Sequence, residues 1–236
     1  MKKVLIIVLL ILTGLVIGGV AWWRVRAGRP DRMLSRAQTA LNASMLDDAM
    51  ALAARYAERF PDDWHGYFIK AQVLMRRGQY AEARETLARA VELLKNNVAA
   101  GDAGDTKNIT RIEMVMANSY SFPASYVMAK RSDDVSEKQL QDAAENIKKS
   151  LKILGDIKEA DIGLHLDILQ AAGLDSRLLG ECYGRIAGKL RAQARLRQSG
   201  GFEKRYETIM RSAADYDRLA AAAYTEAMNK LYDVVS

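Results

Sequence analysis

Apolar and polar residues divide this chain into a short, uniformly apolar beginning and a long remainder with helical periodicity. Residues 4–23 contain no charged side chain. Further along, apolar residues recur every three to four positions, and the clearest stripe consists of Leu140, Ala144, Ile147, Leu151 and Leu154. No alternating run of Val, Ile and Thr bounded by turn residues, the pattern typical of a strand, is found. The sequence therefore predicts an all-α fold.

The apolar stretch Val4–Trp23 has the length of a membrane-spanning helix. A bilayer core of roughly 30 Å is crossed by about 20 residues at about 1.5 Å per residue. A secretory signal has a shorter apolar core that ends at a small-x-small cleavage site. Gly19-Val20-Ala21 could be read as that site, but no polar spacer separates it from the apolar run. We therefore expect a retained single-pass anchor, preceded by the short tail 1–3.

The end of this stretch has the composition of a membrane–water interface. Indole rings favour the headgroup level and cations lie beyond them, and the residues concerned are Trp22, Trp23, Arg24 and Arg26. Within the stretch, Gly14 and Gly18 form a small-xxx-small motif, which permits close packing against another membrane helix. The alternative is the ordinary tolerance of membrane helices for glycine.

The residues that flank the anchor leave two orientations in the membrane open. Lys2 and Lys3 precede it, whereas five arginines lie between residues 24 and 36. The positive-inside rule, which counts Lys and Arg, would keep the body of the protein in the cytoplasm. A short MKK-type tail before an apolar run instead resembles bacterial signal-anchors, which export the rest of the chain. We expect a single-pass protein of the inner (cytoplasmic) membrane with a periplasmic body, and a cytoplasmic body is the alternative.

Few residues of the remaining chain suit catalysis or metal binding. Cys182 is the only cysteine, and its place in an apolar stripe indicates a small core residue rather than a nucleophile. His65 and His165 are isolated, and no cluster of His, Cys or carboxylates has zinc-type spacing. No glycine-rich phosphate loop, nucleophile elbow or nucleotide fingerprint occurs. We therefore expect no metal, no cofactor and no enzymatic activity.

Two segments in the first half align without gaps at an offset of 34 residues. Small residues meet small residues in three pairs, which are Ala37 with Ala71, Ser44 with Gly78, and Ala49 with Ala83. Small side chains at such positions let helices approach closely, and bulky neighbours fill the gaps between them. The period therefore indicates two consecutive helical hairpins of one kind.

This pattern resembles the tetratricopeptide repeat (TPR) family. Tyr67, Ala71 and Leu74 fall where the first helix of that repeat carries a bulky, a small and a second bulky residue, and GQYAEA at 78–83 resembles its interhelix turn. Lys70 and Lys95 depart from the usual leucine and closing proline. The resemblance implies an α-solenoid, and the expected divisions are an anchor 4–23, a basic linker 24–32, two repeats 33–95, a loop 96–110 and a degenerate helical domain 111–236.

The second half is helical but less regular. Residues 96–108 are rich in turn formers, which predicts the loop, and Pro123 is expected to kink or restart the helix after that loop. The residues after Gly200-Gly201 form one long apolar stripe, which predicts a final capping helix. Because solenoids generally need three or more repeats, we expect this half to continue the stack.

In proteins of the TPR type, the first helix of each pair lines a concave groove. Helical periodicity then points His65, Phe68, Gln72, Met75 and Arg76 into that groove. The equivalent residues one repeat earlier are Leu34, Gln38, Leu41 and Asn42. We expect Phe68 and Met75 to be exposed and to receive a peptide with apolar and acidic or carboxyl-terminal features. The alternative is that the second half buries both as core.

A basic patch stands out in the second half, within a chain of net charge +6. It includes Arg185, Lys189, Arg191, Arg195 and Arg197. Such a run suits anionic lipid headgroups, but no interleaved aromatic residues suggest base stacking, so no nucleic-acid partner is expected. The alternative is a solvated helix face.

These expectations lead to two functional hypotheses, neither of them enzymatic. In the first, the protein is a membrane-anchored adaptor or scaffold that binds protein partners and assembles or holds an envelope complex. In the second, it is a permanent accessory subunit of a large membrane complex, bound mainly through its transmembrane helix. Co-migration with such a complex in mild detergent distinguishes the second hypothesis from the first.

Overall fold

The computed structural model describes residues 30–99, 105–157, 162–199 and 203–235, and every regular element in these ranges is a helix. The expected all-α fold is therefore confirmed for the described residues. The α-helices are α2 (Pro30–Asn42), α3 (Leu46–Arg59), α4 (Trp64–Arg76), α5 (Tyr80–Ala99), α6 (Asp105–Ala129), α7 (Glu137–Asp156), α8 (Ile162–Ser199) and α9 (Glu203–Val235), with a short 3-10 helix at Ser132–Asp134.

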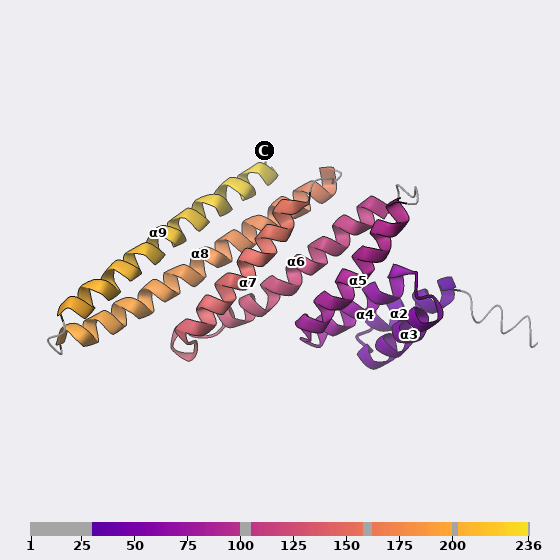
Figure 1. Cartoon of the computed structure of the whole chain (residues 1–236), viewed down its shortest axis with the longest axis horizontal. Helices are drawn as coiled ribbons and strands as arrows, with labels where there is room; N and C mark the ends of the chain where they lie inside the picture. The colour runs from indigo at the N-terminus through magenta and orange to yellow at the C-terminus, as the bar shows by residue number, and fades with distance from the viewer. Residues whose placement is uncertain (1–29, 100–104, 158–161, 200–202, 236) are drawn as a thin grey trace, which may run out of the picture.

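Helices that are consecutive along the chain lie side by side in an elongated stack (Figure 1). The hairpin of α2 and α3 forms one end, and the long pair α8 and α9 forms the other. Each helix packs mainly on its neighbours in sequence, which is the contact pattern of an α-solenoid. The last helix, α9, agrees with the long final helix expected from the apolar stripe.

The expected membrane anchor lies outside the described residues. The same holds for Gly14, Gly18 and the interface residues Trp22, Trp23, Arg24 and Arg26. Among the helices that the structure does describe, none is both long and apolar enough to span a bilayer.

The two hairpins at the start of the stack turn in the same way, 34 residues apart. Ser44 and Gly78 both have a left-handed backbone, with φ of 59° and 75°. The amide of Met45 donates to the carbonyl of Ala40 at 2.9 Å, and the amide of Gln79 donates to that of Leu74 at the same distance. These bonds satisfy carbonyls at a helix end that otherwise lack partners. The gapless sequence match thus corresponds to a repeated turn geometry.

This turn allows a matched pair of stability predictions. Ser44→Gly should raise the free energy of unfolding by about 0.5 kcal/mol, because glycine adopts a left-handed backbone without the Cβ clash. Gly78→Ala should lower it by about 1 kcal/mol, because it introduces that clash. Urea unfolding of the detergent-solubilised protein, monitored by circular dichroism, measures both. Effects of the same sign in the two variants would contradict this account.

Both ends of the loop expected at 96–110 are helical in the structure. Helix α5 continues to Ala99 and α6 already begins at Asp105. The Asn97 side-chain amide donates to the Asp105 carboxylate at 3.2 Å, so residues with turn propensity are held within helical ends by a contact between the two helices. The prediction was wrong here because local propensity is weak against tertiary contacts.

Of the two outcomes expected at Pro123, a kink or a restart of the helix, the restart does not occur, since α6 runs through this residue from Asp105 to Ala129. Proline lacks an amide hydrogen, so the carbonyl four residues earlier, that of Ser119, loses its helical donor. The Arg84 guanidinium of α5 takes its place and donates to the Ser119 carbonyl at 3.1 Å. The same guanidinium lies 4.3 Å from the centre of the Tyr120 ring. A neighbouring helix therefore supplies the hydrogen bond that proline removes.

Candidate functional site

A groove of about 460 Å³ lies across three alternate helices, α2, α4 and α6. Helices α2 and α4 are the first members of the two repeated hairpins, and α6 comes after them in the stack. Six of its lining residues come from α2 and α4, namely Gln38, Leu41, Asn42, Gln72, Met75 and Arg76. These six belong to the set of nine that the sequence placed on a concave face, so the structure brings most of that set together.

Three residues of that set do not line the groove. Leu34 packs against the core cluster formed by α2, α3 and α4. The ring nitrogen Nδ1 of His65 lies 2.6 Å from the Asp63 carboxylate, at the start of α4. Phe68 packs against the core cluster of α4 to α6, with its ring 5.9 Å from that of Trp64. These side chains therefore stabilise hairpins.

The expected exposure of the apolar groove residues also needs correction. Leu41 is 1% exposed and belongs to the core, although it borders the groove. Phe68 and Met75 are half-buried against the cluster that contains Ala71 and Leu87. They are buried because α6 packs on the hairpin of α4 and α5, and no sequence pattern indicated the register of that helix. Met75 still reaches the groove, whereas Phe68 does not.

Arg76 has a structural partner as well as a place in the groove. Its guanidinium donates to the carbonyl of Leu41, one of the last in α2. Terminal carbonyls of a helix lack internal donors and carry partial negative charge, so a cation there is stabilising. Substitution of Arg76 would therefore disturb the packing of α4 on α2 and is a poor probe of binding.

Helix α6 supplies the groove residues that sequence reasoning missed. They are Val115, Asn118 and Phe122, which succeed one another at helical spacing along one face. Phe122 is 48% exposed although it is a large apolar side chain. The spacing was present in the sequence, but the 34-residue offset does not extend to α6, so nothing aligned these residues with those of α2 and α4.

The groove combines amide groups with apolar side chains. Amides come from all three helices, with Gln38 and Asn42 on α2, Gln72 on α4 and Asn118 on α6. Gln38 donates to Asn42 at 3.1 Å, on the exposed surface. Each amide offers both a donor and an acceptor, as a peptide backbone does. The arrangement is chemically suited to an extended peptide that hydrogen-bonds through its main chain and places an apolar side chain near Phe122.

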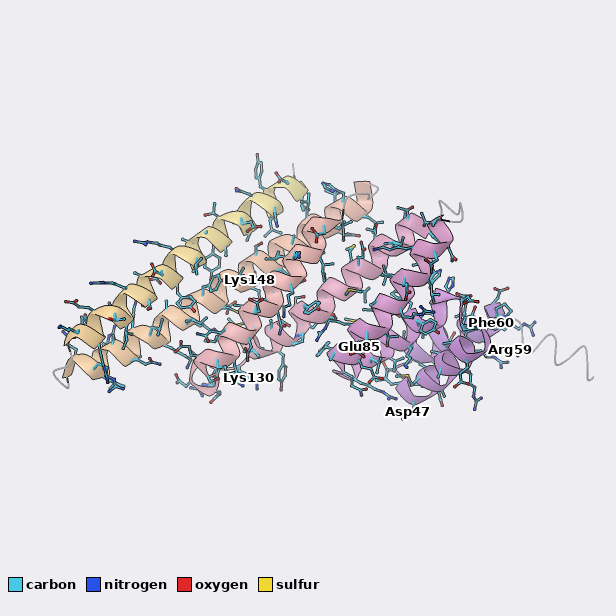
Figure 2. The ribbon with its side chains drawn as sticks, in the orientation of Figure 1. Asp47, Arg59, Phe60, Glu85, Lys130 and Lys148 are labelled. Carbon is cyan, nitrogen blue, oxygen red and sulfur yellow. The ribbon has the colours of Figure 1, made fainter. Side chains whose placement is uncertain are left out.

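The structure divides the expected basic patch into residues with different roles. Arg185 donates to the carbonyls of Met128 at 2.8 Å and of Lys130 at 2.9 Å, at the end of α6, where Figure 2 labels Lys130. Arg191 pairs with Asp217 of α9. The other members are Lys189, which is half-buried, and Arg195 and Arg197, which are exposed. Two of the five cations therefore connect helices, and the patch is not a uniform basic surface.

Cys182 is a core residue, as expected. It is fully buried, and its sulfur lies 3.3 Å from that of Met128. Burial, together with the nearby Glu181 carboxylate, raises the pKa of the thiol to about 12. The thiol is therefore protonated at neutral pH and is a packing group rather than a nucleophile.

Comparison with known proteins adds no family to these observations. The chain matches no protein-family model, and it matches no curated protein either.

Proposed function

We propose that this protein is a membrane-anchored adaptor with a TPR-like helical stack, whose groove across α2, α4 and α6 binds an extended segment of a partner protein. The observation that carries the proposal is the composition of the groove, where four amides and the exposed ring of Phe122 converge from three helices. A groove of this composition exposes polar groups and an apolar ring to water, and an extended peptide would satisfy both.

The expected anchor gives the proposal its cellular setting. A stack tethered at a membrane raises the effective concentration of partners that reside there. We propose that these partners are membrane or envelope proteins of a bacterial cell, and that the body is periplasmic. Binding of a flexible segment, with little buried area, suits an adaptor that assembles or holds a complex.

Phe122→Ala should reduce partner binding by about tenfold, as for the loss of one hot-spot residue worth about 1.4 kcal/mol. Phe122 is chosen because its side chain is exposed and does not belong to the core clusters. By contrast, Phe68 packs against the core and Arg76 donates a hydrogen bond to α2. The measurement is the yield of crosslinked partner when the full chain is purified from native membranes, with circular dichroism to check helicity.

Tyr232→Ala is the matched control, because Tyr232 is also an exposed aromatic residue, at 69%, but lies on α9. Its substitution should leave the yield unchanged. An equal yield from Phe122→Ala and the unaltered protein would place binding elsewhere. If the protein then co-migrated with a large complex through its apolar segment alone, the permanent-subunit hypothesis would replace the adaptor.

A further inference from the structure

Helix α3 covers one face of α4 closely. A Cβ atom at Gly66 of α4 would lie 2.8 Å from the Tyr56 ring and 3.1 Å from the backbone nitrogen of Ala57. Further along the same face, Val73 is fully buried in a cluster with Ala49 and Ala53 of α3. At its end, Arg77 pairs with Asp47, the α3 residue that Figure 2 labels at the edge of the stack. This face of the repeat is therefore built to receive a helix.

Among the described residues, no helix covers the same face of the first repeat. A shift of 34 residues from Gly66, Ile69, Val73 and Arg77 leads to Arg32, Ser35 and Thr39 of α2 and to Ala43 directly after it, and all four are exposed. Within the described part of the chain, α2 packs mainly on α3 and α4. In the described part of the chain this surface of α2 is therefore open, whereas α3 occupies the equivalent surface of α4.

An apolar groove of about 510 Å³ lies beside this surface, between α2 and α3. Its apolar lining consists of Ala40, Ala43, Met45, Ala51 and Leu52. Met45, in the turn between the two helices, is 52% exposed. The small alanines would allow the backbone of another helix to approach closely.

The opposite end of the stack has both apolar and polar groups on its surface, and Leu219, Met228 and Tyr232 of α9 are large apolar residues that are exposed. The exposed side of α9 carries ion pairs along its length, including Glu207 with Arg211 at 3.7 Å and Asp215 with Arg218 at 3.3 Å. The end formed by α2 and α3 differs in that its apolar residues line a groove between two helices, with an arginine on each side.

The charges at the groove identify the kind of helix that fits. Arg36 and Arg55 stand on its two sides, one on each helix, and neither forms an ion pair with another described residue. Asp48 is the one acidic residue of the lining. We propose that the groove between α2 and α3 binds an amphipathic helix of another protein, which presents small and medium apolar residues to Ala43 and Leu52 and carboxylates to Arg36 and Arg55.

Two other occupants fit the charges less well. The chain segment before α2 carries Arg24, Arg26 and Arg29 and would bring like charges to Arg36 and Arg55. A second copy of the same face would also bring these arginines to one another, because the interface of a two-fold dimer is self-complementary. An acidic helix from a different protein has neither conflict.

The test places a photo-crosslinking amino acid at Ala51, an exposed residue of the groove, in the full chain in its native membrane. The crosslinked peptide is then identified by mass spectrometry. We expect a segment of a different protein with an apolar stripe at helical spacing and flanking Asp or Glu. The double variant R36E/R55E should lower the crosslink yield by roughly tenfold or more, since two attractive charges become repulsive.

The matched control is R195E/R197E, which makes the same change of charge at two exposed arginines of α8 and should leave the yield unchanged. A synthetic peptide of the identified segment should also bind the purified protein and become helical. A crosslink to residues 1–29, to a second copy or to lipid would overturn the proposal, as would no crosslink or a yield indifferent to R36E/R55E. Phe122→Ala should not change this crosslink, so failure here is separable from failure of the groove across α2, α4 and α6.

Discussion

Arg84→Met should lower the free energy of unfolding by about 1.5–5 kcal/mol, the largest effect we expect from a single surface-accessible side chain. Two losses combine. The carbonyl of Ser119, a fully buried residue, would be left without a donor, which costs about 1–3 kcal/mol. The cation–π contact with Tyr120 would also be lost, at about 0.5–2 kcal/mol. Methionine keeps an apolar stem of similar length, so little packing is lost with the charge.

The same substitution in a Pro123→Ala variant tests whether the lack of an amide at Pro123 makes the Arg84 guanidinium necessary. Alanine restores the amide that donates to the Ser119 carbonyl, so Arg84→Met should then cost only about 1 kcal/mol. Urea unfolding of the four proteins of this cycle gives the coupling energy directly. Equal costs of Arg84→Met in the two backgrounds would show that the guanidinium does not compensate for the proline.

Arg185→Ala should lower the free energy of unfolding by about 1.5–3 kcal/mol, whereas Arg195→Ala should change it by less than about 0.5 kcal/mol. The Arg185 guanidinium donates to two carbonyls at the end of α6 and to the Glu181 carboxylate at 3.1 Å. Arg195 is exposed on the same helix. The two substitutions remove the same charge from the same basic run, so they separate a structural role from a purely electrostatic one.

Vesicle binding completes this comparison. If the basic run bound anionic lipid as one surface, both substitutions should weaken binding of the solubilised protein to phosphatidylserine vesicles by a similar factor. If Arg185 acts within the fold, Arg195→Ala should have the larger effect on vesicle binding and the smaller effect on unfolding. Equal effects of the two variants in both measurements would contradict the structural role of Arg185.

Features set by neighbouring residues in the chain were accessible from the sequence. Apolar spacing predicted helices, and the match of Ser44 with Gly78 marked a turn whose backbone hydrogen bonds are local. The repeat also predicted that Gln38, Gln72 and Met75 lie on one face, because residues at equivalent positions in stacked hairpins lie on the same side. The burial of Cys182 was indicated by its place in an apolar stripe.

Features set by contacts between distant residues were not accessible in this way. Pro123 alone indicates a kink or a restart of the helix, and Arg84 on the adjacent helix supplies the donor that Pro123 lacks where α6 continues through it. Phe122 lines the groove and Phe68 does not, because α6 packs on the hairpin of α4 and α5. Arg185 and Arg191 differ from Arg195 only in the groups that face them. The sequence by itself determined the helices and the repeated turn, since these depend on residues a few positions apart. The tertiary structure decided which polar groups were already satisfied and which apolar groups stayed exposed, because both depend on the register between helices.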